Sequence, residues 1–137
     1  MSSTHPPLDI RFQRLREVRA ALLRLHKRLL DSEREGYEQS HGRIRSNGEF
    51  LRLVLEDEWF TWLRPFSQFI VKIDEALSPK ESITLQKADE LLKEASSLLT
   101  PSEEGSDREQ RYYQAIQRDP DIAFMHAQIS SLLATES

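Results

Sequence analysis

The chain has 137 residues, of which 38% are hydrophobic and 31% are charged, a composition typical of one globular domain. It contains no cysteine, which excludes disulfide frameworks and thiolate metal sites, and its four glycines argue against a turn-rich β fold. Residues 1–52 hold 11 basic and 7 acidic residues, whereas residues 53–137 hold 8 and 16. We therefore expect the two halves to attract each other, within the fold or between copies.

The sequence shows no export or membrane segment. Residues 1–7 lack the basic and apolar regions of a secretory signal. The longest charge-free run of the central segment, residues 65–71, is far shorter than the roughly 20 residues of a membrane span. We expect a cytoplasmic protein without a membrane partner, in which one domain at residues 8–134 lies between tails at residues 1–7 and 135–137.

The first long helix is predicted from about Leu8 to about Gln39. Its apolar residues alternate three and four positions apart, as they do on the buried stripe of an amphipathic helix. They are Leu15, Val18, Leu22, Leu25 and Leu29.

The second long helix is predicted over about residues 47–76, after a capping-box pattern of Ser46 and Glu49. Pro65 falls inside this helix, lacks a backbone N–H and would clash with the carbonyl of Thr61. We expect a kink there rather than an end, because the apolar residues stay in phase on both sides. They are Leu55, Trp59, Trp62, Phe66, Phe69 and Ile73.

The last third of the chain predicts shorter helices. One covers about residues 84–99, and a second capping box at Ser106 and Glu109 opens another. Asp119 followed by Pro120 is typical of an N-cap with proline at the first helical position. The predicted fold is all-α, an antiparallel up-down four-helix bundle with long helices 1 and 2, a short helix 3, and a fourth helix bent or split at Asp119-Pro120.

Three ionisable residues of the first helix, Arg19, His26 and Glu33, fall seven apart and inside the arc of its apolar stripe. Buried charges need partners, and the hairpin geometry suggests Arg52 for Glu33, and Glu58 or Glu56 for His26 or Arg19. We call these residues, except Glu56, the polar seam. They are either internal salt bridges that fix the helix register, or a pocket in which His26 binds a ligand or transfers a proton.

Motifs for catalysis and for cofactors are missing from the sequence. The single Glu-x-x-His pair, Glu38 and His41, lies at a helix end, and a di-iron bundle would need two such pairs. No nucleophile motif and no glycine-rich phosphate loop is found. We therefore predict no catalytic residue, no metal and no cofactor.

The arginines of the first helix do not form an uninterrupted basic stripe. Acidic residues, among them Glu17, Asp31 and Glu35, are interleaved with them. Such a face is typical of solvated intrahelical ion pairs, so we predict no nucleic-acid partner.

The segment 112–127, with Tyr113, Ala115 and Asp119-Pro120, resembles the junction between tetratricopeptide repeats. The tryptophan and Leu-Gly signature of that family is missing upstream, and no 34-residue period is present. We ascribe the resemblance to shared helix capping and carry no function over from it.

Four apolar residues of the second helix, Phe50, Leu53, Phe60 and Val71, lie outside its main stripe. The short third helix also leaves residues 30–58 uncovered, unless a second copy covers them. Exposed apolar surface of this kind marks interfaces. We predict a non-enzymatic self-associating or protein-binding module, most simply a homodimer; the alternative is a small-molecule or metal-binding bundle that uses the polar seam.

Overall fold

The structure, a computed structural model, describes residues 6–78 and 83–134. All regular structure in these ranges is helical, which confirms the predicted all-α fold. The elements are α1 (Pro6–His41), α2 (Asn47–Glu56), the 3-10 helix η1 (Glu58–Leu63), α3 (Arg64–Ala76), α4 (Leu85–Leu98), α5 (Asp107–Arg118) and α6 (Pro120–Ala134). The prediction of four helices was wrong, because the described residues form six α-helices and one 3-10 helix.

The predicted tails fall mostly outside the described residues, although Pro6 and Pro7 already belong to α1. Proline suits the first turn of a helix, where no backbone N–H is needed. None of the helices in the described ranges has the length and apolar character to cross a membrane.

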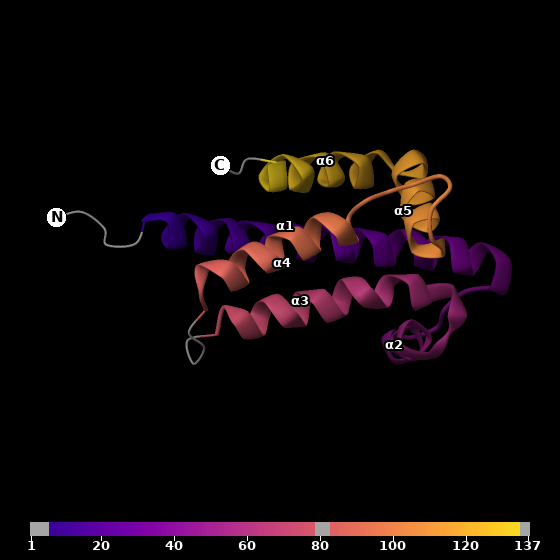
Figure 1. Cartoon of the computed structure of the whole chain (residues 1–137). Coiled ribbons are helices and arrows are strands. Elements are labelled where there is room, and N and C mark those ends of the chain that lie inside the picture. Colours follow the sequence, from indigo (N-terminus) through magenta and orange to yellow (C-terminus); the bar gives the residue numbers. More distant parts are fainter. Residues whose placement is uncertain (1–5, 79–82, 135–137) are drawn as a thin grey trace.

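Helix α1 is the spine of the fold, and α3, α4 and α6 lie along it (Figure 1). Successive members of this group run in opposite directions (Figure 1). The predicted stripe of α1 is confirmed as the centre of the core, because each of its five residues is 0% exposed. These residues are Leu15, Val18, Leu22, Leu25 and Leu29.

Arginines beside this stripe reach acidic residues of the neighbouring helices. Arg11 forms an ion pair with Asp89 of α4, and Arg19 forms one with Asp74 of α3. Arg28 pairs with Asp119, at the junction of α5 and α6. The expected attraction between the basic first half and the acidic second half is thus confirmed within one molecule.

The predicted second helix is broken at Asp57, and the expectation of a simple kink at Pro65 was wrong. The backbone of Asp57 is extended, at φ −87° and ψ 142°, and its carboxylate accepts a 2.8 Å hydrogen bond from the N–H of Trp59. Asp57 therefore ends α2 and caps η1, since a short carboxylate competes well with helical hydrogen bonds. Pro65 then lies in the first turn of α3, where its missing N–H is tolerated.

The break at Asp57 changes which residues of this segment face the core. Leu55 is 61% exposed although the continuous helix would have buried it, whereas Trp62 and Phe66 are buried. The 3-10 turns of η1 rotate the chain between α2 and α3. The apolar residues of the two helices therefore do not lie on one continuous helical face.

The predicted split of the last helix is confirmed, because α5 ends at Arg118 and α6 begins at Pro120. The predicted capping box of Ser106 and Glu109 is present at the start of α5. Helix α5 lies across the C-terminal part of α1 (Figure 1), and Arg118 contacts Glu33 there. The expectation that residues 30–58 are uncovered was wrong for α1, since η1 packs on it and Trp59 lies against Gly36. It holds for the outer face of α2, where Leu51 and Leu55 are 58% and 61% exposed.

Gly36 of α1 allows the ring of Trp59 to lie close to the helix. A Cβ atom at Gly36 would be 3.3 Å from Trp59 Cζ2, whereas a Cβ at Gly48 of α2 would meet only Ser46 Oγ at 3.9 Å. The indole Nε1 of Trp59 also donates a 3.1 Å hydrogen bond to the backbone carbonyl of Glu33.

We predict that Gly36→Leu lowers the free energy of unfolding by about 1–3 kcal/mol relative to Gly48→Leu, because the added side chain overpacks against Trp59. The comparison cancels the helix propensity that both substitutions gain. Urea denaturation followed by circular dichroism measures the difference. Equal stability of the two variants would contradict the close packing at Gly36.

Candidate functional site

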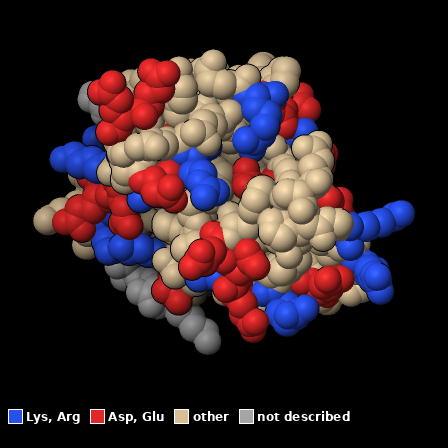
Figure 2. Space-filling view, turned by 90° about the vertical axis from the view of Figure 1, so that its right-hand side faces the viewer, with Lys and Arg blue, Asp and Glu red and all other residues tan. Residues whose placement is uncertain are grey.

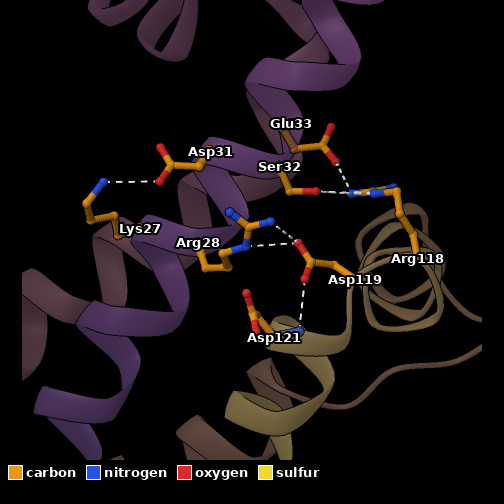
Figure 3. A network of polar contacts seen from close by, with 8 residues as sticks. All are labelled: Lys27, Arg28, Asp31, Ser32, Glu33, Arg118, Asp119 and Asp121. Atoms are coloured by element: carbon orange, nitrogen blue, oxygen red, sulfur yellow. Dashed lines mark hydrogen bonds and ion pairs between the residues drawn. The ribbon is translucent and has the colours of Figure 1, made fainter.

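A polar cleft of about 710 Å³ lies where α5 and the start of α6 meet α1. Helix α1 contributes Arg28, Ser32 and Glu33 to its lining, and the α5–α6 junction contributes Arg118 and Asp119. Figure 3 shows these side chains pointing toward one another across the gap between the helices. The cleft has the size of a small-molecule site, but its walls are polar rather than apolar.

Asp119 joins three elements through one side chain. Its Oδ1 accepts a 2.9 Å hydrogen bond from the N–H of Asp121, as expected of the N-cap of α6. Its Oδ2 accepts hydrogen bonds from Arg28, at 2.9 Å from Nε and also from Nη2. The residue is only 7% exposed, so α1 is tied to the end of α5 and to the start of α6 by a buried carboxylate.

The charge of Asp119 is stabilised in the fold. Burial by itself would raise the pKa of the carboxyl group. The hydrogen bonds from Arg28 and from the N–H of Asp121 outweigh burial and hold the pKa below its ordinary value. The buried group is therefore a paired anion and not a proton donor at neutral pH.

Glu33 is the second buried carboxylate of the cleft, at 7% exposed. Its Oε2 accepts a 2.8 Å hydrogen bond from Arg118 Nη2, and the same guanidinium donates to Ser32 Oγ at 3.1 and 3.2 Å. Both buried acids of the cleft thus have an arginine partner from the facing element. This pairing is typical of ion pairs that fix the orientation of helices.

The residues of the predicted polar seam do not gather at one place. Glu33 pairs with Arg118 and not with Arg52, because the break at Asp57 carries α2 away from this part of α1 while α5 crosses it. Arg52 and Glu58 are exposed. Of the five residues, only Glu33 lines the cleft.

The other two residues of the polar seam lie elsewhere on α1. Arg19 pairs with Asp74 of α3 rather than with Glu58. His26 is half-buried, which lowers the pKa of its imidazole, and it forms no ion pair with the residues that the structure describes. A role of His26 in ligand binding stays a prediction.

Sequence reasoning missed three members of the cleft, Arg28, Ser32 and Arg118. It identified Glu33 as inward-facing and Asp119 as a helix cap, and both are confirmed. An inward carboxylate signals that a cation is near, but the sequence does not distinguish Arg118 from the other arginines. Arg118 is 85 residues from Glu33 along the chain, so no local pattern indicates that the two residues pair.

The predicted interface residues divide into buried and exposed ones. Leu53 is 9% exposed and Phe60 is 0% exposed, so both belong to the core, since α2 packs on η1 and η1 packs on α1. Phe50 is half-buried, with its ring centroid 5.7 Å from that of Phe60 and the guanidinium of Arg34 above it. Val71 is 54% exposed.

Charges of both signs alternate over the face of the molecule at the α5 end (Figure 2). No three His, Cys, Asp or Glu side chains within the described ranges come together as the ligands of a metal ion do. The cleft therefore offers hydrogen bonds and paired charges, but no cation site formed by described residues.

Comparisons of the chain with protein-family models, with curated proteins and with solved structures find no match. Function must therefore be argued from the arrangement of the residues themselves.

We predict that Asp119→Ala lowers the free energy of unfolding by about 2–4 kcal/mol, since it removes the cap of α6 and leaves Arg28 without its partner. Asp119→Asn should lose less, because the amide oxygen still accepts the N–H of Asp121. Folding lowers the pKa of Asp119, so its stabilising contribution is present above the ordinary value of 3.8 and is lost as the pH falls through the lower folded value.

Urea denaturation at pH 7 and at pH 3 measures both effects. The gap between the wild type and Asp119→Asn should shrink at pH 3. A gap of the same size at both pH values would show that the charge of Asp119 does not contribute.

We also predict that the stability of the protein falls as the pH is lowered from 7 to 5. Burial lowers the pKa of His26 and of His126 from 6.5, so the neutral rings stabilise the fold above that value and the contribution is lost at lower pH. Thermal melting of His26→Gln, and of the double variant with His126→Gln, should show a successively weaker pH dependence. A dependence in His26→Gln equal to that of the wild type would contradict the burial of this ring.

Proposed function

We propose that this protein is a non-enzymatic binding module that associates with a second copy of itself through the outer face of α2. The observation that carries the proposal is a pair of leucines, Leu51 and Leu55, which are 58% and 61% exposed. They are four residues apart and therefore lie one turn apart on the same face of the helix. Contiguous exposed apolar side chains of this kind are typical of interfaces.

The inner face of α2 is already occupied. Leu53 is buried, and Phe50 and Val54 are half-buried against the core. Figure 1 shows α2 at the edge of the molecule, beside the start of α3 and far from α4 and α6. The outer face is therefore free to meet another molecule without any change in the fold.

The charges beside the leucine pair favour a second copy as the partner. Arg52 and Glu56 are exposed on the same side of the pair, one turn apart, and neither forms an ion pair with the described residues. In an antiparallel two-fold pairing of α2 helices, Arg52 of one copy lies opposite Glu56 of the other, twice by symmetry. Such complementarity sets the register of an interface more than its affinity.

The proposed interface is small, because a helix of ten residues supplies it. Burying the exposed part of four leucines can contribute on the order of 4–7 kcal/mol, and association opposes this by several kcal/mol. The expected dissociation constant is thus about 1 mM or higher, that of a weak and reversible dimer.

The paired carboxylates of the polar cleft support the non-enzymatic part of the proposal. Glu33 and Asp119 are each held by an arginine, so neither is a free general base.

Sedimentation velocity over a concentration series tests the dimer. The wild type should be partly dimeric at about 1 mM, and Leu51→Glu with Leu55→Glu should be monomeric with unchanged helicity. Phe124→Glu, at a 65% exposed apolar residue of α6, is the matched control and should leave the dimer intact.

Charge reversal tests the antiparallel register in the same experiment. Arg52→Glu and Glu56→Arg should each weaken the dimer, and the double variant should restore it. A wild type that stays strictly monomeric at about 2 mM, or an equal loss with Phe124→Glu, would overturn the proposal.

A further inference from the structure

We infer that a basic pocket between α1, α4 and α6 binds the phosphate group of a phosphate monoester. The pocket has a volume of about 320 Å³ and lies away from both α2 and the polar cleft. Its charged and polar lining comes from Arg11 and Arg14 of α1, and from Asp89, Lys93 and Ser96 of α4. Leu133 of α6 supplies part of an apolar wall.

The pocket has an excess of positive charge. It contains three cationic side chains and one carboxylate, Asp89, which is paired with Arg11. Arg14 and Lys93 form no ion pair with the residues that the structure describes. An excess of two charges matches a phosphate monoester, which carries about −1.5 to −2 at neutral pH, better than it matches a single carboxylate.

One guanidinium nitrogen at this pocket, Nη1 of Arg14, is buried without a hydrogen-bond acceptor. Nε of Arg11 lies 2.5 Å from Oδ1 of Asp89, so the charge of Arg11 is already paired. A buried donor without an acceptor is unfavourable, and phosphate oxygens, like carboxylate oxygens, are strong acceptors for guanidinium groups. The arginines of the polar cleft differ, because Arg28 and Arg118 donate to carboxylates of the protein.

A second basic pocket, between α3, α4 and α5, has a weaker case. It contains Lys72 and Arg108, but Glu94 accepts a 3.0 Å hydrogen bond from Lys72. Only one positive charge remains unpaired there, so the pocket at Arg14 is the better match for a dianion.

The phosphate monoester can belong to a small metabolite or to a lipid headgroup, and the experiment separates these sources. Glycerol 3-phosphate is titrated into the protein by calorimetry at about 0.15 M salt, where diffuse charge effects are screened. In parallel, the protein is sedimented with phosphatidylcholine vesicles with and without phosphatidic acid. Saturable binding in either arm supports the site and identifies the source of the phosphate.

Arg14→Gln and Lys93→Gln should each weaken the binding at least tenfold. Arg24→Gln on α1 and Lys87→Gln on α4 are matched controls, since both side chains are exposed and lie outside the pocket, and both remove the same charge. They should change the affinity less than twofold. Thermal melts of all four variants establish that the fold is retained.

Three results would overturn the inference. The first is the absence of saturable binding in both arms, and the second is an equal loss of affinity in the controls. The third is binding of acetate as tight as that of glycerol 3-phosphate, which would remove the preference for a dianion.

Discussion

The apolar stripe of α1 is the contact on which the other elements depend. Five fully buried residues between Leu15 and Leu29 contribute about 1.5–3 kcal/mol each, a sum comparable with the whole stability of a small domain. The surface ion pair of Arg19 with Asp74 adds at most about 1 kcal/mol, because both side chains are more than one-third exposed. Burial therefore holds α3, α4 and α6 against α1, and the arginines beside the stripe add ion pairs to α3, α4 and the α5–α6 junction.

The polar cleft lies beside the part of α1 that the shorter helix α4 cannot cover. Helix α1 has 36 residues and α4 has 14, so the C-terminal part of α1 needs other cover. The 3-10 helix η1 packs on α1, and two buried carboxylates, Glu33 and Asp119, tie the α5–α6 junction to α1 through an arginine of the facing element. Paired charges specify one orientation more sharply than an apolar contact, which tolerates sliding. The ion pairs of the cleft thus fix how the α5–α6 junction is oriented on α1.

The sequence predicted those parts of the structure that depend on neighbours within one helical turn. The stripe of α1, the capping box at Ser106 and the split at Asp119 all rest on spacings of two to four residues. The break at Asp57 was missed, because the apolar residues of a continuous helix would stay in phase across Pro65. In the structure the side chain of Asp57 caps η1, and Trp59 packs on Gly36. The inward orientation of Glu33 followed from periodicity, but its partner depends on how α5 crosses α1, which no local pattern encodes.

The contact between α1 and α6 joins the first described helix to the last, and every other element lies between them in the sequence. A chain emerging from the ribosome therefore exposes part of the α1 stripe until residues 120–134 have followed. Such delayed closure leaves a long amphipathic helix open to chaperones, or to the α1 of another nascent chain, for most of the time of synthesis. The apolar stripe of α1, which holds the finished fold together, is thus the surface most prone to wrong contacts during synthesis.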